Sequence, residues 1–257
     1  MTNPLESPFN VLVTGGARRI GRAIVEDLAS HGFRVAIHCN RLRDEGEALR
    51  QEIVDRGGRA VVVQADLTDP DAMAELVPRA ERELGPLSIL VNCASIFEWD
   101  KATDFSWETW DSHFAIHVKA PVMLSRVFAE RLAPRREGLV VNIIDQRVLR
   151  PNPRYFTYFL SKATLWAATQ TMAQALAPRV RVNAIGPGPT LPNKRQTDHD
   201  FAAQVEGLIL QRGPELKEFG ATIRYLWEAR SVTGQMIALD GGQHLAWRTP
   251  DVSGMKE

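Results

Sequence analysis

The sequence predicts an α/β fold, in which one doubly wound domain holds a mostly parallel sheet of seven strands flanked by helices. Strand-length apolar runs alternate with helix-length amphipathic stretches along the chain, and parallel strands need crossover connections of that length. No linker, repeat or low-complexity segment interrupts the alternation. A length of 257 residues would also allow two small domains, but the unbroken pattern favours a single domain over residues 1–257.

The elements of the first half are marked by apolar periodicity and by helix-start signals. Short runs rich in β-branched residues indicate strands, and apolar residues at spacings of three and four indicate helices. Before the third helix, Thr68 or Asp69 can act as the cap and Pro70 suits the first helical position. In this half we expect strands at 9–13, 33–38, 59–64 and 87–91, and helices at 18–30, 44–56 and 69–84.

The second half continues the pattern with longer helices and one irregular segment. We expect helices at 107–132 and 155–177, strands at 138–144, 179–185 and 235–240, and two more helical stretches before the last strand. The segment 186–200, "GPGPTLPNKRQTDHD", is too long for an ordinary connection, and loops of that length often carry function. We therefore expect the region 186–213 to lie on the substrate side.

Composition excludes several classes of protein. Lys plus Arg and Asp plus Glu are equal at 31 each, so no global charge would attract nucleic acid or an anionic membrane. The two cysteines, Cys39 and Cys93, lack the spacing of a zinc site or a disulfide framework. The first residues, "MTNPLESPFN", show no targeting signal, and no apolar run reaches membrane-spanning length. We expect a cytoplasmic protein without a metal, a membrane partner or a nucleic-acid partner.

The segment "VLVTGGARRIGRA" places a strand, a glycine turn and a helix start in sequence. Glycines let the backbone approach a pyrophosphate, and the N–H groups of the helix N-terminus face the anion. A simple tight turn is the alternative interpretation. A P-loop is disfavoured, because its Lys and Ser/Thr positions hold Arg22 and Ala23.

The end of the second strand indicates which nicotinamide cofactor would bind. An acid there would accept hydrogen bonds from the ribose of NAD and repel a 2′-phosphate. The chain instead reads His38-Cys39-Asn40-Arg41. Arg41, together with Arg18, can pair with a phosphate, so we expect NADPH as the cofactor. The alternative is that Arg41 is an ordinary solvated arginine.

Tyr158 and Lys162 lie four residues apart in an expected helix, on one helical face. An ammonium beside a phenol favours the phenolate, so Lys162 is expected to lower the tyrosine pKa toward the range of a general acid–base. The pair alone is weak evidence, because such spacings occur by chance. Thirteen positions earlier stands Asp145, at the end of the apolar run "VVNII". A charge there costs free energy unless it is paired or used.

With these motifs in order, the chain resembles the short-chain dehydrogenase/reductase family over nearly its whole length. The matching segments are "TGGARRIG", "ADLTD", "NCAS", "YFLSK", "NAIGPGPT" and "TGQMIALDGG". The resemblance implies a Rossmann-type reductase in which Tyr158 is the acid, Lys162 holds the nicotinamide ribose and Thr190 contacts the carboxamide. It also implies a homotetramer that pairs across the two long helices.

Three residues depart from the family pattern, namely Asp145 in place of the usual Ser, Arg19 in place of a loop glycine, and His117. Asp145 and Arg19 are similar to the pteridine reductases and the bacterial dihydromonapterin and dihydrofolate reductases, as are the segment "ASIF" ending at Phe97, the His38-x-x-Arg41 sequence and the Tyr155-x-x-Tyr158 pair. In that subgroup the pterin stacks on an aromatic ring at the Phe97 position, and an Asp–Tyr pair delivers the proton. His117 stands where the family has the Asn of its proton relay, which leaves open whether the imidazole shuttles protons.

The chemistry agrees with this subgroup. A carbonyl reductase develops negative charge on oxygen, which an ionised Asp145 would repel. A pterin instead offers a ring nitrogen that must be protonated and N–H donors for a carboxylate. Phe97 offers a stacking face, although a single Phe after a strand is often core.

The sequence thus predicts an NADPH-dependent reductase of a dihydropterin or dihydrofolate. The alternatives are a reductase of another carbonyl or imine, and a catalytically silent NADPH-binding sensor or assembly protein. Expected catalytic residues are Asp145, Tyr158 and Lys162. Expected substrate-binding residues are Arg19, Ser95, Phe97, Asp145 and Tyr158. Expected cofactor-binding residues are Gly15, Arg18, Arg19, Ile20, Gly21, His38, Asn40, Arg41, Asp66, Leu67, Asn92, Ala94, Ser95, Tyr158, Lys162, Pro187, Gly188 and Thr190.

Overall fold

The computed structural model describes residues 9–193 and 195–249 and has seven strands in one sheet. The strands are β1 (Asn10–Val13), β2 (Arg34–Cys39), β3 (Ala60–Gln64), β4 (Ile89–Asn92), β5 (Gly138–Ile143), β6 (Val180–Pro187) and β7 (Met236–Leu239). They lie in the order β3-β2-β1-β4-β5-β6-β7, and every pairing is parallel. The doubly wound α/β prediction is confirmed. The segment 1–8, on which the expected absence of a targeting signal rests, lies outside the described residues.

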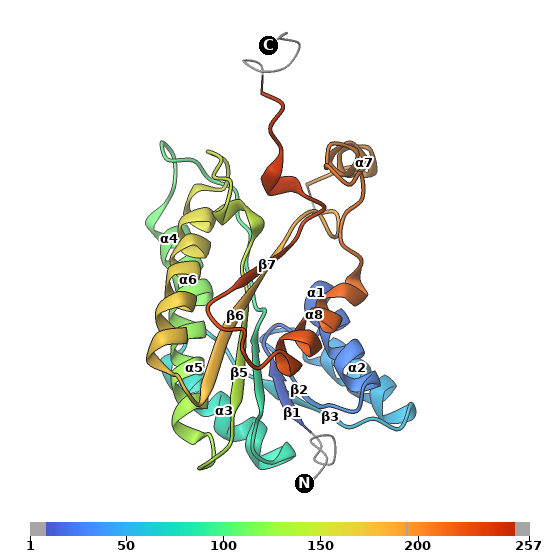
Figure 1. Ribbon diagram of the computed structural model, residues 1–257, viewed down its shortest axis with the longest axis vertical. Coiled ribbons are helices and arrows are strands. Elements are labelled where there is room, and N and C mark those ends of the chain that lie inside the picture. The colour runs from blue at the N-terminus through green and yellow to red at the C-terminus, as the bar shows by residue number, and fades with distance from the viewer. Residues whose placement is uncertain (1–8, 194, 250–257) are drawn as a thin grey trace.

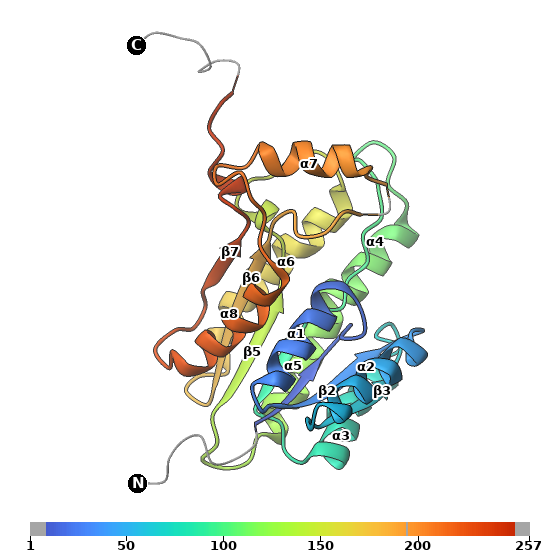
Figure 2. The ribbon, with the colours of Figure 1, turned by 90° about the vertical axis from the view of Figure 1, so that its right-hand side faces the viewer.

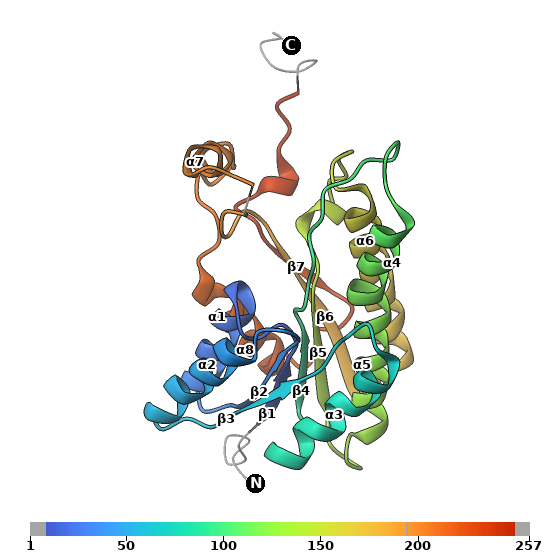
Figure 3. The same cartoon turned by 180° about the vertical axis from the view of Figure 1, so that it is seen from behind.

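Helices cover both faces of this sheet (Figure 1). One face carries α1 (Arg19–Ser30), α2 (Arg43–Asp55) and α8 (Leu216–Glu228). The opposite face carries α3 (Pro70–Leu84), α4 (Trp107–Phe114), α5 (Ala120–Arg131) and α6 (Phe156–Ala175), and Figure 3 shows both layers from behind. The remaining helix, α7 (Asp198–Glu206), lies beyond the carboxyl ends of the strands (Figure 2). None of the helices in the described ranges is long and apolar enough to cross a membrane.

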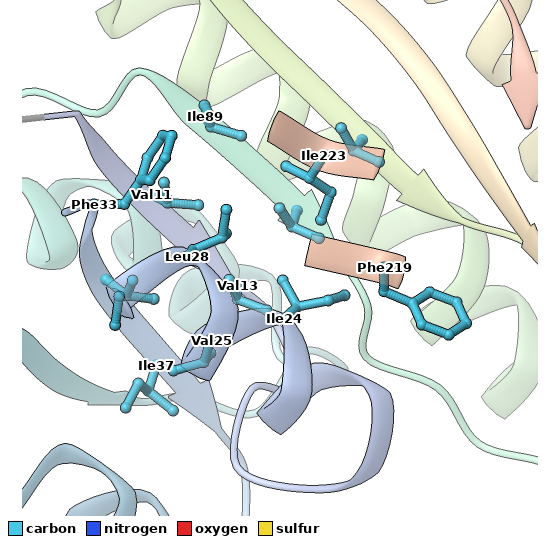
Figure 4. Close-up of a cluster of buried hydrophobic side chains, with 14 of the residues drawn as sticks. Val11, Val13, Ile24, Val25, Leu28, Phe33, Ile37, Ile89, Phe219 and Ile223 are labelled. Carbon is cyan, nitrogen blue, oxygen red and sulfur yellow. The ribbon is translucent and has the colours of Figure 1, made fainter. Parts of the chain in front are cut away.

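The core forms two layers because strand side chains alternate between the faces of the sheet. Val11 and Val13 of β1 belong to the layer that packs on α1 and α8, whereas Leu12 belongs to the opposite layer. Figure 4 shows the first layer, in which Ile24 of α1 and Phe219 of α8 meet. Burial on both faces makes the sheet a rigid base for the loops at its carboxyl edge.

Local signals set the start of α3 as the sequence predicts. Asp69 is the cap residue, and its carboxylate accepts hydrogen bonds from the backbone N–H groups of Asp71 and Ala72 at 2.9 and 3.4 Å. Pro70 occupies the first helical position, where its missing N–H costs nothing. Of the two proposed caps, Asp69 is the one that acts.

The expected helical region 107–132 is helical from Trp107 to Arg131, but not as one uniform α-helix. A π-helical turn, η1 (Ala115–Lys119), separates α4 from α5, and such wider turns often occur at functional sites. It contains the buried His117. The irregular segment is also shorter than expected, because β6 runs to Pro187 and α7 begins at Asp198.

Candidate active site

The predicted residues gather at the carboxyl edge of the sheet, around the ends of β1, β4, β5 and β6. Between β1 and β4 the strand order reverses direction, and ligands of open α/β sheets bind at such a point. Helix α6 supplies the remaining side chains along the β5 side.

Asp145 follows β5, and each of its two carboxylate oxygens accepts a hydrogen bond. It is the cap of the short 3₁₀ helix η2 (Gln146–Val148), and its Oδ1 accepts a hydrogen bond from the Arg147 backbone N–H at 2.8 Å. Its Oδ2 accepts the Tyr158 hydroxyl at 3.0 Å. The carboxylate at the end of the buried strand therefore has the partners that its burial requires.

Tyr158 and Lys162 are both buried on α6. The Lys162 ammonium donates to the Ile143 carbonyl at 2.9 Å and lies 5.7 Å from the centroid of the Tyr158 ring. Burial lowers the pKa of Lys162 to about 8, against the opposing effect of Asp145. A buried ammonium beside the phenol is the arrangement that the helical spacing predicts.

The expected depression of the Tyr158 pKa is wrong for this arrangement of side chains. Burial, and then the charge of Asp145, raise the pKa of Tyr158 well above its usual value. Arg147 opposes that rise through its positive charge. Tyr158 is thus a neutral phenol at neutral pH, and it holds a proton that it can donate.

An aromatic group faces this pair. The Phe97 ring stacks on Tyr155 with centroids 4.0 Å apart and meets Tyr158 edge-on at 4.7 Å. Tyr155 precedes α6 with a left-handed φ of 57°, which a non-glycine residue adopts at a cost of roughly 1 kcal/mol. Phe97 is therefore part of the site rather than of the core.

Arg147 also belongs to this group, and the sequence reasoning missed it. Its guanidinium lies over the rings of Phe97 and Tyr155, at 5.4 and 5.2 Å from their centroids, and 3.8 Å from the Asp145 carboxylate. Its Nη1 is buried without a hydrogen-bond partner among the described residues. The sequence feature that could have indicated Arg147 as a site residue is its position two residues after Asp145, on the same turn.

The glycine loop has the close approaches that a phosphate-binding turn needs. Gly15 has φ +64°, and a Cβ there would lie 2.8 Å from the Ala94 Cα. A Cβ on Gly21 would lie 2.1 Å from the Gly15 carbonyl oxygen. Arg19 has φ 51°, the left-handed conformation that glycine favours. The loop therefore keeps its glycine-type backbone although Arg19 replaces a glycine.

Beside this loop lies a cavity of about 210 Å³. Arg18 and Arg41 line it, and Asn40 stands where an acid would repel that phosphate. Arg18 also meets Glu45 at 3.4 Å. The lining of the cavity includes the predicted residues Gly15, Arg18, His38, Asn40, Arg41, Leu67, Ala94 and Ser95.

His38 borders this cavity, but protein groups occupy both of its ring nitrogens. The Gly15 backbone N–H donates to Nδ1 at 3.1 Å, and Nε2 lies 3.1 Å from the Ala65 carbonyl oxygen. Burial lowers the pKa of His38 to about 4, which keeps the imidazole neutral. His38 thus holds the glycine loop in place.

Other predicted cofactor residues make internal contacts. The Asp66 carboxylate accepts hydrogen bonds from the N–H and hydroxyl of Thr68, and these bonds lower its pKa. The Asn92 amide donates to the buried Asn142 side chain at 2.8 Å. Ile20 packs against the core beside the loop. Three residues lie together at or just beyond the end of β6, namely Pro187, Gly188 and Thr190.

The segment after β6 is tied to both sides of the site. The Arg19 guanidinium donates to the carbonyls of Leu191 and Pro192 at 3.3 and 3.1 Å. Arg195 donates to the Phe97 carbonyl at 3.2 Å and pairs with Glu98 at 2.8 Å. The Arg19 side chain therefore positions the segment after β6.

His117 does not have the free ring nitrogen that a proton shuttle needs. Its Nε2 accepts the Ile96 backbone N–H at 3.2 Å, and its Nδ1 lies 2.8 Å from the Ser161 hydroxyl. Burial lowers its pKa well below the usual value. The hypothesis that the imidazole replaces the relay Asn as a shuttle is therefore not supported by this geometry.

The fold and the Tyr158–Lys162 pair define a reductase of the short-chain type, and comparison with known proteins agrees. The short chain dehydrogenase family matches residues 10–201. A short-chain type dehydrogenase/reductase of Picea abies is 30% identical over 251 residues, covering 90% of this chain and 91% of the relative. The chain therefore belongs to the short-chain dehydrogenase family.

Within the family, the chain is similar to a particular solved structure. FolM alternative dihydrofolate reductase 1 from Brucella suis, in complex with NADP, is 62% identical with a TM-score of 0.93, covering 95% of this chain and 98% of that one. A 3-oxoacyl-[acyl-carrier-protein] reductase of Staphylococcus epidermidis is 28% identical, covering 92% and 99%. The chain is an NADP-dependent oxidoreductase of the pteridine and folate reductase-like subgroup.

Proposed function

We propose that this enzyme reduces a pterin-type heterocycle, a dihydropterin or dihydrofolate, with NADPH. The observation that carries the proposal is the 3.0 Å hydrogen bond from the Tyr158 hydroxyl to the Asp145 carboxylate, beside the Phe97 ring. A carboxylate there opposes the charge of a developing alkoxide. It suits a heterocycle whose N–H groups donate to it.

Side chains of the protein donate the proton to the substrate and orient the hydroxyl that carries this proton. NADPH, when bound, supplies the hydride that a ring carbon of the substrate accepts. Tyr158 donates its proton to the adjacent ring nitrogen, and Asp145 orients the hydroxyl. Lys162 and Arg147 place positive charge near the phenolate that forms. The net reaction consumes one NADPH and one proton for each double bond reduced.

The remaining predicted roles follow this scheme. Arg18 and Arg41 bind the 2′-phosphate, and Gly15 and Gly21 let the backbone approach the pyrophosphate. Thr190 and the neighbouring residues after β6 contact the nicotinamide. Arg19, Ser95 and Phe97 line the pterin site, and the region 186–213 covers it.

Initial rates across a substrate panel test the proposal. With NADPH, the purified enzyme should turn over dihydrobiopterin, dihydromonapterin or dihydrofolate faster than simple ketones and enones. Tyr158→Phe should abolish that turnover, which would exclude a silent nucleotide-binding protein. Oxidation of NADPH with ketones alone, and none with any pterin, would contradict the proposal.

A second candidate is the reduction of another carbonyl or imine. The similarity to a 3-oxoacyl-[acyl-carrier-protein] reductase favours it. The carboxylate of Asp145 beside Tyr158 argues against this candidate, because it would repel the negative charge that develops on a carbonyl oxygen. The same panel separates the two, because a 3-oxoacyl thioester would then be the fastest substrate.

We also propose a cytoplasmic homotetramer formed by the whole chain as a single domain. An aromatic group on and around α4 supports an interface there. Trp107 is 69% exposed and contacts Phe105 and Trp110, and Trp110 in turn stacks on Phe114. Light scattering of the purified enzyme measures the assembly directly.

A further inference from the structure

Two histidines of the α4–η1 segment bind the chain after β4 in the same way. The Ile96 backbone N–H donates to Nε2 of His117 at 3.2 Å. Two residues further on, the Glu98 backbone N–H donates to Nε2 of His113 at 3.3 Å. Phe97 lies between the two held amides, so both bonds fix the backbone that carries its ring.

The other ring nitrogen of each histidine faces a hydroxyl on α6. Nδ1 of His113 lies 2.7 Å from the Thr157 hydroxyl, and Nδ1 of His117 lies 2.8 Å from the Ser161 hydroxyl. His113 and His117 are four residues apart, as are Thr157 and Ser161, so each pair lies on one face of its helix and the two faces are in contact. Tyr158 follows Thr157 directly and contacts both imidazole rings edge-on at 5.9 and 5.3 Å.

The direction of each hydrogen bond is fixed by chemistry. A backbone N–H can only donate, so Nε2 of each histidine must accept and Nδ1 must carry the proton. The hydroxyls are oriented to match: Thr157 donates to the Asp100 carboxylate and Ser161 donates to the Tyr158 carbonyl. Each hydroxyl oxygen can therefore accept from a histidine. Both imidazoles are neutral and fully bonded.

The chain after β4 is anchored differently on its cofactor side. The Thr14 hydroxyl oxygen accepts the backbone N–H groups of Cys93 and Ala94 at 2.9 and 3.0 Å. Ala94 lines the nucleotide cavity. Thr14, directly after β1, thus holds residues 93–94, whereas the histidines hold residues 95–98, because the Ser95 hydroxyl also lies 3.0 Å from Nε2 of His117.

We propose that His113 and His117 are positioning residues that fix the Phe97 ring relative to Tyr158, and so set the affinity for the heterocyclic substrate. The proposal rests on the proposed pterin reductase function. Both histidines are buried, at 0% and 1% exposure, and they act through the backbone of residues 96–98. His113 therefore affects the substrate more than NADPH, whereas His117 also contacts Ser95, which lines the nucleotide cavity.

Paired substitutions separate the two contacts of each ring. In His117→Gln the amide oxygen can stand at the place of Nε2 and still accept from Ile96. In His117→Asn the amide nitrogen can stand at the place of Nδ1 and still donate to Ser161, but the loop contact is lost. His113→Gln and His113→Asn divide the contacts to Glu98 and Thr157 in the same way.

The kinetic readout is the KM for dihydropterin, with NADPH affinity measured in parallel. One lost hydrogen bond corresponds to roughly tenfold in affinity. We expect the Asn variants to raise the dihydropterin KM about tenfold and the Gln variants to stay within about twofold. NADPH binding should stay within about twofold in both His113 variants, whose contacts lie outside the nucleotide cavity lining. Equal KM values in Asn and Gln variants, with only melting temperature lowered, would overturn the proposal.

Hydrogen exchange gives a readout that needs no turnover. The amide protons of Ile96 and Glu98 should be protected in the wild-type enzyme, and each should exchange faster in the corresponding Asn variant. Unprotected amides in the wild type would overturn the proposal. An enzyme that reduces no pterin but shows this protection would refute the proposed function and keep the histidine contacts.

Discussion

At the scale of single residues, Asp145 illustrates how one side chain combines a structural and a chemical contact. One carboxylate oxygen caps η2 through the Arg147 N–H, and the other accepts the Tyr158 hydroxyl. These contacts use different atoms, so substitutions can separate them. Asn keeps an oxygen for the cap and removes the charge, whereas Ser removes both carboxylate oxygens.

We expect Asp145→Ser to lower dihydropterin turnover about 100-fold, the lower range for a lost acid–base contribution. NADPH affinity should change little, because Asp145 lies outside the nucleotide cavity. Steady-state kinetics and NADPH titration measure both quantities. Asp145→Asn is the matched control: if the charge matters, it is impaired as well. Full activity of Asp145→Asn would show that Asp145 acts only as the cap of η2.

Arg41 gives a second test at a single residue. It lines the nucleotide cavity, and an arginine–phosphate bond contributes about 1.5–3 kcal/mol. We expect Arg41→Ala to raise the KM for NADPH about tenfold or more and to leave that for NADH within about twofold. Arg43→Ala removes the same charge from the start of α2, outside the cavity lining, and serves as control. Equal losses with both cofactors would refute the assignment of Arg41 to the 2′-phosphate.

At the scale of elements, the close contact of α1 with α8 depends on a glycine. A Cβ on Gly220 of α8 would lie 2.4 Å from the Asp27 side chain of α1. Asp27 is in turn held by Arg224 at 2.9 Å. In Gly220→Ala, overpacking of about 2 kcal/mol should outweigh a helix-propensity gain of about 1 kcal/mol. We expect a lower thermal midpoint.

Gly46 of α2 is the matched control for that substitution. The nearest atoms that a Cβ there would meet belong to the Val62 side chain at 3.3 Å and the Cys39 sulfur at 3.6 Å, with no backbone atom as close. Gly46→Ala should therefore gain up to about 1 kcal/mol of helix propensity. Thermal unfolding of both variants compares the two helices. A stabilised Gly220→Ala would show that α8 moves away from α1 at little cost.

The elements that the sequence predicted are those defined by local pattern. Apolar alternation and the cap at Asp69 depend on neighbouring residues, so the strands and the start of α3 were found. The π turn was missed because apolar spacing indicates a helix but does not distinguish i→i+5 backbone bonds from i→i+4 bonds within a single turn. Arg147 and His113 were missed because their partners Phe97 and Thr157 lie 50 and 44 residues away, where no local pattern connects them.

At the scale of the whole molecule, three of the six histidines are buried and neutral. His38 holds the glycine loop, and His113 and His117 hold the chain after β4. Burial is the first cause of the lowered pKa in each case. His38 lies near the charged groups of Asp66 and Arg79. His113 lies near those of Asp100, Glu98 and Lys162, and His117 lies near Lys162 and the titratable ring of His113.

These histidines make the folded enzyme sensitive to acid. An unfolded chain binds protons at its histidines below about pH 6.5, whereas folded His38 stays neutral down to about pH 4. The free energy of unfolding is thus unaffected by the protonation of these histidines above about pH 6.5. It decreases as the pH falls toward 4, by as much as about 3 kcal/mol for His38. We expect the thermal midpoint to fall over this range. In His38→Gln the fall should be shallower, because one proton fewer is taken up on unfolding. An unchanged slope in that variant would show that carboxylates alone cause the acid sensitivity.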